Sequence, residues 1–263
     1  MTRKYFNVDV IPDIVDGDIS EAFGDIAGGD IVFDWTAVDV PKGSCMLRSV
    51  AAYVNAEDGA YGAGSLTDYE LLFAKSIKGV APPTIGATNA VQTGCGALRH
   101  HFIGGVRLES EAGKGTLTKT TLGVVYLSGQ GGTQTATAGS KGYDLVVDLD
   151  PISGTHVGYD KLYVAGLQVS ARNYNTNVLA DGAVTAASAQ SKTITVKTTD
   201  ATLLFSPGDQ VYVMDLDTPI PGNLTKVEAT TLTFDTANTT VDITDGDELI
   251  NANPIRIRLG FEK

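Results

Sequence analysis

The stretch Ile255-Arg256-Ile257-Arg258-Leu259 alternates apolar and charged side chains without interruption. Successive side chains of a β-strand point to opposite faces of the sheet, so this pattern predicts a strand with one buried face and one wet face. Other segments rich in β-branched and aromatic residues recur along the chain, and clusters of Gly, Pro or Asp separate nearly all of them. No amphipathic pattern is long enough for a helix of more than about three turns. The sequence therefore predicts an all-β protein.

Residues 30–180 are predicted to form the main domain. Its expected strands lie at 31–35, 46–54, 69–73, 102–108, 118–127, 143–149 and 162–170. The segment 69–73 is nearly all apolar, which indicates burial on both faces. Two segments are expected to be loops: 78–92, which contains two consecutive prolines, and 128–141, which is low in complexity. Several short strands separated by turn signals favour a β-sandwich or a jelly-roll-like fold.

A second, smaller β unit is expected at the C-terminal end. Residues 181–192 are dominated by Ala, Ser and Gly, and they are predicted to be a linker. Short strands are expected after it at 193–196, 208–213, 224–227, 231–234, 246–249 and 255–259. About seventy residues in short strands match the size of an SH3-like or OB-like β-barrel, which is the prediction for 193–263.

The first 29 residues are predicted to form an extended N-terminal arm. Pro12, Gly17 and several Asp residues break any long element, and the apolar residues are too few for a separate core. Two possibilities are open for this segment. It adds a strand to the body, or it reaches onto another subunit.

Composition and charge exclude several classes of function. The chain has 43% hydrophobic and 19% charged residues, which is typical of a globular protein, and its formal net charge is −12. Because an acidic chain repels phosphate backbones, nucleic-acid binding is not expected. The sequence has no apolar run of about 18 residues for a membrane span. Its start lacks the apolar stretch of a signal peptide, so synthesis in a cytoplasm is expected.

The sequence contains few residue types that carry enzymatic chemistry. It has three histidines, and His100 and His101 would point to opposite faces of a strand. No nucleophile motif of the G-x-S-x-G type is present. Cys45 and Cys95 match no metal-ligand spacing and are interpreted as small buried residues, with a disulfide as the alternative. No catalytic, cofactor-binding or metal-binding residue and no cofactor is therefore predicted.

Acidic residues offer the remaining route to a reaction. A glycosidase needs two carboxylates, and Asp residues at 34, 144, 148, 150 and 160 could converge, but no spacing singles out a pair. Trp35 lies in an apolar strand, which favours a core position over a sugar platform. The acidic turns at 16–21 and 245–248 lack the pattern of a calcium-binding loop, so solvated turns are favoured over a cation site.

Several segments together resemble virion structural proteins of tailed bacteriophages. The likeness lies in Val32-Phe33-Asp34-Trp35, Val40-Pro41-Lys42-Gly43 and Leu162-Tyr163-Val164-Ala165-Gly166-Leu167, and in the ending Pro254-Ile255-Arg256-Ile257-Arg258. The resemblance implies a non-enzymatic particle component, with capsid decoration (cement) as the leading role and the virion capsid surface as its location. A tail, baseplate or fibre component is the main alternative, and a carbohydrate-binding protein is a further one.

The resemblance also implies partners. Decoration proteins sit on the shell as oligomers, so a homo-oligomer is expected, with a trimer favoured, in contact with the major capsid protein or other virion proteins. No membrane partner is expected. Interfaces depend on a few well-packed anchors, and aromatic residues are frequent among them. The candidate partner-binding residues are Tyr5, Phe6 and Phe23.

Overall fold

The computed structural model describes residues 4–12, 14, 25–40, 45–54, 68–93, 95–108, 123–126, 145–147, 161–173, 177–184, 192–197, 200–216 and 218–263. The protein is all-β, as predicted, and its strands pair antiparallel. The helices in the described ranges are short: α2 (Cys95–Leu98), η2 (Ala201–Leu203) and η3 (Met214–Leu216). None of them has the length and apolar character needed to cross a membrane.

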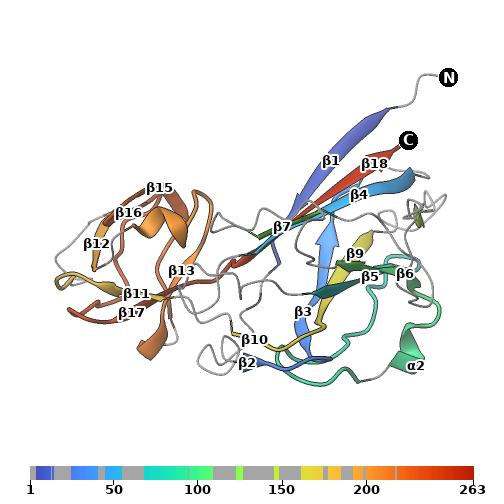
Figure 1. Cartoon of the computed structure of the whole chain (residues 1–263), viewed down its shortest axis with the longest axis horizontal. Coiled ribbons are helices and arrows are strands. Elements are labelled where there is room, and N and C mark those ends of the chain that lie inside the picture. Colours follow the sequence, from blue (N-terminus) through green and yellow to red (C-terminus); the bar gives the residue numbers. More distant parts are fainter. Residues whose placement is uncertain are drawn as a thin grey trace.

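The first sheet joins the two ends of the chain. Its order is β1 (Tyr5–Val10), β18 (Ile255–Glu262), β4 (Cys45–Val54), with β7 (Gly123–Tyr126) and β8 (Leu145–Val147) both pairing with β4. Figure 1 shows β1, β18 and β4 side by side, and the two termini lie at the same end of these strands. The alternating stretch at 255–259 is thus a central strand, with Ile255, Ile257 and Leu259 buried.

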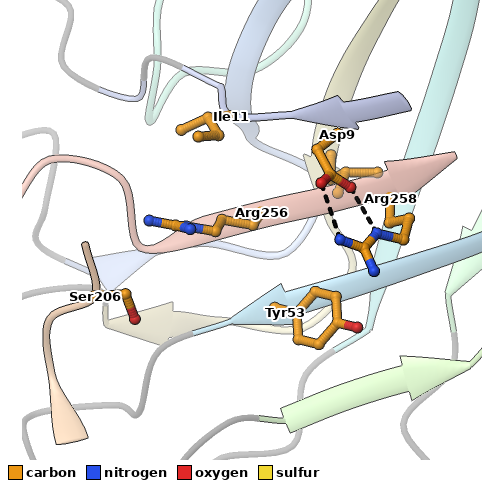
Figure 2. Close-up of a pocket in the computed structure, with 7 residues that line it drawn as sticks. Asp9, Ile11, Tyr53, Ser206, Arg256 and Arg258 are labelled. Carbon is orange, nitrogen blue, oxygen red and sulfur yellow. Dashed lines mark hydrogen bonds and ion pairs between the residues drawn. The ribbon is translucent and has the colours of Figure 1, made fainter. Parts of the chain in front are cut away.

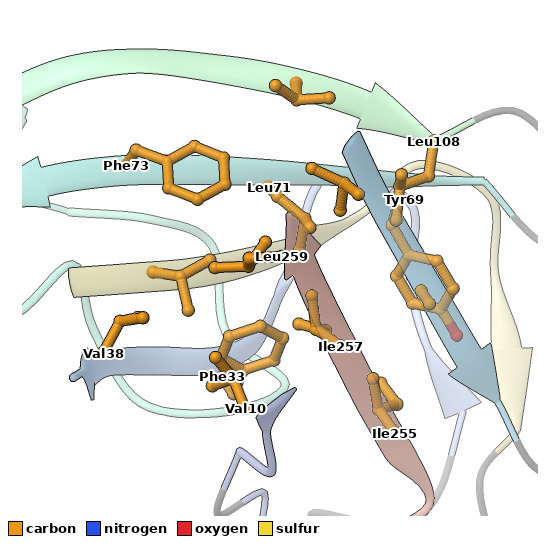
Figure 3. Packing of buried hydrophobic residues seen from close by; sticks show 14 of the residues in the cluster. Val10, Phe33, Val38, Tyr69, Leu71, Phe73, Leu108, Ile255, Ile257 and Leu259 are labelled. Carbon is orange, nitrogen blue, oxygen red and sulfur yellow. The ribbon is translucent and has the colours of Figure 1, made fainter. Parts of the chain in front are cut away.

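The second sheet has the order β3 (Ile31–Val38), β9 (Leu162–Gln168), β5 (Tyr69–Lys75), β6 (Phe102–Leu108). One of its faces shares a hydrophobic cluster with the first sheet, in which Phe33, Leu71 and Phe73 pack with Ile257 and Leu259 (Figure 3). The other face carries a smaller cluster that includes residues of the 77–93 loop and of α2. Because both faces are covered, β5 is apolar at nearly every position, as its sequence predicts.

The 77–93 loop is irregular, as expected, but it is fixed to the second sheet. Ile85 is fully buried, and its N–H donates to Asp34 Oδ1 at 3.2 Å. The indole Nε1 of Trp35 donates to the carbonyl oxygen of Pro83 at 2.9 Å. Trp35 therefore holds this loop against the sheet and packs against the smaller cluster.

The third sheet is built from the C-terminal part of the chain and lies at the other end of the molecule in Figure 1. It has a hydrophobic cluster of its own. Its strand order is β14 (Thr218–Pro219), β13 (Val211–Val213), β17 (Glu248–Asn251), β11 (Asn177–Ala180), β12 (Thr193–Lys197), β16 (Thr231–Phe234), β15 (Leu224–Glu228). A two-stranded ribbon of β2 (Asp25–Ile26) and β10 (Arg172–Asn173) completes the described sheets.

The sheets divide the chain differently from the predicted segments at three places. β1 lies within the predicted arm, yet it pairs with β18 over its whole length, so this part of the arm adds a strand to the body. β11 precedes the predicted linker but belongs to the third sheet, where it pairs with β12 and β17. The sequence predicts β18 in the small barrel, but this strand crosses back to pair with β1 and β4.

Candidate functional site

A surface pocket lies on the face of the first sheet that points away from the shared hydrophobic cluster. We call this the outer face. β1, β4 and β18 place their side chains there in register, because Asp9 lies opposite Arg258 and Arg256 lies opposite Tyr53. The pocket encloses about 280 Å³. Figure 2 shows its lining, which consists of Asp9, Ile11, Tyr53, Ser206, Arg256, Ile257 and Arg258.

An ion pair forms one side of the pocket. Arg258 donates from Nε to Asp9 Oδ1 at 2.6 Å and from a second nitrogen to Asp9 Oδ2 at 2.9 Å (Figure 2). This hydrogen bonding lowers the pKa of Asp9, and the same contact raises the pKa of Arg258. Both groups are therefore charged at neutral pH. Neither is suited to exchange a proton with a bound molecule.

The opposite side of the pocket rests on a buried carboxylate. Asp209 is only 2% exposed, and it accepts hydrogen bonds from Arg256, from Asn251 Nδ2 at 2.7 Å and from the N–H of Ser206 at 2.8 Å. Burial raises the pKa of Asp209, while the hydrogen bond from Arg256 acts in the opposite direction. Arg256 also donates to the carbonyl oxygen of Pro207 at 3.1 Å. This network ties β18 to the turn before β13.

The pocket can bind by hydrogen bonding and apolar contact. Its two guanidinium groups are each balanced by a carboxylate, and Ile11 supplies an apolar wall. None of the described residues that line it is His or Cys. Such a surface suits an amphipathic side chain with an apolar body and a polar tip.

The three predicted partner-binding residues have different surroundings. Tyr5 is 67% exposed at the start of β1, on the outer face. Phe6 points the other way and stacks on Phe261, with ring centroids 5.2 Å apart and planes inclined by 17°. Phe6 therefore supports the end of the first sheet. Phe23 lies outside the described residues.

The histidines and cysteines are not brought into a shared site in the described part of the chain. His101 follows α2, and its Nδ1 lies 2.9 Å from the carbonyl oxygen of Lys75. His100 is exposed next to it, and His156 lies outside the described residues. Cys45 is a buried free thiol whose pKa is raised by burial, which fits its interpretation as a small buried residue.

The acidic residues considered for a catalytic or cation site have structural contacts where they are described. Asp245 accepts from Lys197 Nζ at 2.7 Å and from the N–H of Gly182, and Lys197 lowers the pKa of Asp245. Asp247 accepts from the backbone N–H of Thr244 at 2.7 Å. Positions 144, 148, 150 and 160 and the turn at 16–21 lie outside the described residues. Within the described ranges, no three His, Cys, Asp or Glu side chains gather in a way that could hold a metal ion.

The sequence alone does not single out the pocket residues. One signal is visible: the strict alternation at 255–259 places Arg256 and Arg258 on one wet face. A second signal lies in Tyr5-Phe6-Asn7-Val8-Asp9-Val10, where apolar and polar side chains alternate from Phe6 onward. This pattern indicates a strand with Asp9 on its polar face. Ser206 carries no such signal, because its place in the pocket depends on long-range folding.

Comparisons with protein-family models, with curated proteins and with solved structures find no match to this chain.

Proposed function

We propose that this chain is a non-enzymatic structural protein of a tailed-phage virion, which decorates the capsid by binding the assembled shell. The assignment to a virion rests on the sequence resemblance described above. The observation that supports a binding role is the edge of the first sheet at β1. This strand is the last of its sheet, and it carries the exposed Tyr5. Its second edge pairs with no other strand among the described residues, and such a strand edge is a recurrent surface for contact with another protein chain.

The chemistry of the outer face also supports binding over catalysis. The charged groups of the pocket are held in ion pairs, and the pKa of Asp9 is lowered, away from the neutral range that a general acid or base needs. The acidic balance of the chain fits a particle component that faces solvent and contacts protein. The partner is the major capsid protein or another virion protein.

The finer architecture is part of the proposal. The first and second sheets share one hydrophobic cluster, which supports a β-sandwich. The third sheet curls toward closure, because Leu224 at the start of β15 exchanges backbone hydrogen bonds with Gly208 and Asp209, just before β13. This contact supports a small barrel, although β18 is not one of its strands.

Shell binding is tested by co-sedimentation of the purified chain with shells assembled from the major capsid protein of the same phage. We expect saturable binding to assembled shells and none to the unassembled capsid protein. Because a ligand that binds only the assembled state stabilises that state, bound shells should also dissociate at a higher denaturant concentration.

Deletion of residues 1–28 is a poor test of the contact surface, since Val10, Ile14 and Ile26 lie in the core. Tyr5→Ala leaves the core intact, and it should lower shell binding whether β1 contacts the shell directly or pairs with a second copy. Val91→Ala, at a second exposed site, is its control.

Imaging separates the head from the tail. Virions labelled with an antibody against the chain should carry the label over the capsid. A label confined to the tail would replace this proposal with the tail, baseplate or fibre alternative. Particles without any label, together with no binding to shells, would contradict a virion role.

A further inference from the structure

The hydrogen-bonding direction of each β1 residue follows from its register with β18. The N–H of Lys4 donates to the carbonyl oxygen of Lys263 at 3.1 Å, and the N–H of Lys263 donates back at 2.9 Å. In an antiparallel pair, such hydrogen-bonded positions alternate along the strand. Residues 4, 6, 8 and 10 therefore direct their backbone groups toward β18. Residues 5, 7, 9 and 11 direct theirs away from the sheet, where they form no backbone hydrogen bond within the described part of the chain.

This edge lacks the features that usually prevent strand pairing. Natural edge strands are commonly interrupted by a bulge or a proline, or carry several charged side chains. β1 keeps a regular register over its whole length, and no proline occurs before Pro12. Its acid, Asp9, is already paired with Arg258. Two large apolar side chains flank the strand on the outer face, Tyr5 at 67% exposure and Ile11 at 42%.

We propose that β1 pairs antiparallel with β1 of a second copy of this chain, around a twofold axis at Val8. The sheets of the two copies then become one continuous sheet. In this register, the outward-directed residues form the hydrogen-bonded pairs: Tyr5 lies opposite Ile11 of the second copy, and Asn7 lies opposite Asp9. The two exposed apolar residues of each copy cover each other. A twofold contact closes after two chains, so it predicts a dimer, where the resemblance favours a trimer.

Charge and burial favour this register over its neighbours. An axis at Asp9 would place two Asp9 carboxylates opposite each other, and like charges at opposed positions destabilise a sheet. An axis at Asn7 would place the ring of Tyr5 opposite the carboxylate of Asp9 and would not bring Tyr5 and Ile11 together. The axis at Val8 avoids both problems.

The same register places a side chain at the pocket. Tyr5 of the second copy would lie beside Ile11, which forms a wall of the pocket next to Arg256 (Figure 2). Arg256 uses one terminal nitrogen for Asp209 and Pro207, and its other N–H groups make no hydrogen bond within the described residues. A tyrosine has the apolar ring and the polar hydroxyl that this pocket suits. The pocket is thus the place that receives Tyr5 from the second copy.

The dimer is tested on the purified chain by sedimentation equilibrium over a range of concentrations. The wild-type chain should be a dimer. Asn7→Pro removes an N–H that points out of the sheet and leaves the ladder with β18 intact, so it should weaken dimerisation by about tenfold or more. Tyr5→Lys should have a similar effect. Val91→Lys is the matched control, because Val91 is exposed to the same degree on another part of the body, and dimerisation should be unchanged.

Oxidative cross-linking tests the register. Two Val8 residues on the axis form a non-hydrogen-bonded pair with Cα atoms about 4.5 Å apart, which is within disulfide range, so Val8→Cys should give a covalent dimer with diamide. Asn7→Cys should not, because its two copies are offset along the strands. The proposal would be overturned if the wild-type chain were a monomer at all concentrations or a trimer. It would also be overturned if dimerisation were insensitive to Asn7→Pro and Tyr5→Lys, or if Asn7→Cys alone were cross-linked. No shells are present in these experiments, so they measure pairing between copies separately from shell binding, and shell co-sedimentation can fail or succeed whichever result they give.

Discussion

Replacing Gly166 by alanine is expected to lower the free energy of unfolding by about 2–3 kcal/mol, because it overpacks a filled core. Gly166 lies in β9 directly opposite Phe33 of β3, whose ring is fully buried. A Cβ atom at position 166 would lie 2.3 Å from Phe33 Cε1, well inside van der Waals contact. The ring is fully buried between the two sheets, so it can move aside only by displacing its neighbours. Urea unfolding, followed by the fluorescence of the single tryptophan, Trp35, measures the change.

A matched glycine and a compensating change make this prediction specific. A Cβ atom at Gly96 in α2 would have no neighbouring atom within 4 Å, so Gly96→Ala should leave stability unchanged or raise it slightly. In the double variant Gly166→Ala/Phe33→Leu, the smaller side chain leaves room for the methyl group. Its loss of stability should be smaller than the sum of the two single changes. If Gly166→Ala were as mild as Gly96→Ala, the packing of Phe33 on this glycine would be incorrect.

Gly166 illustrates what the sequence can and cannot predict. Apolar residues predict the strand at 162–170, and β9 begins at the same position. Periodicity assigns a residue to a face but does not name the residue opposite it. The pairing of Gly166 with Phe33 joins positions far apart in the chain, so no local pattern carries it.

β18 shows the same limit at the level of the fold. Its alternation correctly predicts a strand with Ile255, Ile257 and Leu259 on the buried face. Its closeness in sequence to the other C-terminal strands suggests, wrongly, that it belongs to the small barrel. The hydrophobic effect does not follow proximity in the chain: these three residues are buried between the first and second sheets. The assignment of this strand therefore required the three-dimensional structure.

The candidate site is predictable only in part. The sequence suggests Tyr5 as an exposed aromatic residue, and it lies exposed on β1. Phe6 is suggested for the same reason, but its neighbour in space is Phe261, at the other end of the sequence. The pocket depends on the ion pair between Arg256 of β18 and Asp209, which lies in the turn before β13. Local sequence reasoning finds side chains of a suitable kind, and the long-range register decides which of them share a surface.

Replacing Arg256 by methionine is expected to lower the free energy of unfolding by about 3 kcal/mol at neutral pH, because it leaves a buried carboxylate without its cation. Asp209 would keep its hydrogen bonds from Asn251 and Ser206 but would lose the ion pair. Burial raises the pKa of Asp209, and Arg256 opposes that rise in the wild-type chain, so the pKa should rise further in the variant. The measurement is urea unfolding at several pH values.

The pH dependence distinguishes loss of a charge pair from loss of packing. A carboxyl group with a folded-state pKa above its ordinary value of 3.8 contributes stability below that value, and this contribution is lost as pH rises through the folded-state pKa. The gap in stability between Arg256→Met and wild type should therefore narrow on going from about pH 7 to about pH 4, where Asp209 in the variant becomes protonated. Adding Asp209→Asn to Arg256→Met should recover part of the loss at neutral pH, because the amide is uncharged.

Arg258→Met is the control, two residues away on the same face of β18. Arg258 pairs with Asp9 at the surface, and both side chains are at least half exposed, so solvent replaces most of this interaction and little stability should be lost. The contrast between two arginines on one strand isolates the effect of burying the partner carboxylate. Equal losses for the two variants, or a gap for Arg256→Met that does not change with pH, would show that Asp209 is not held as a buried charge by Arg256.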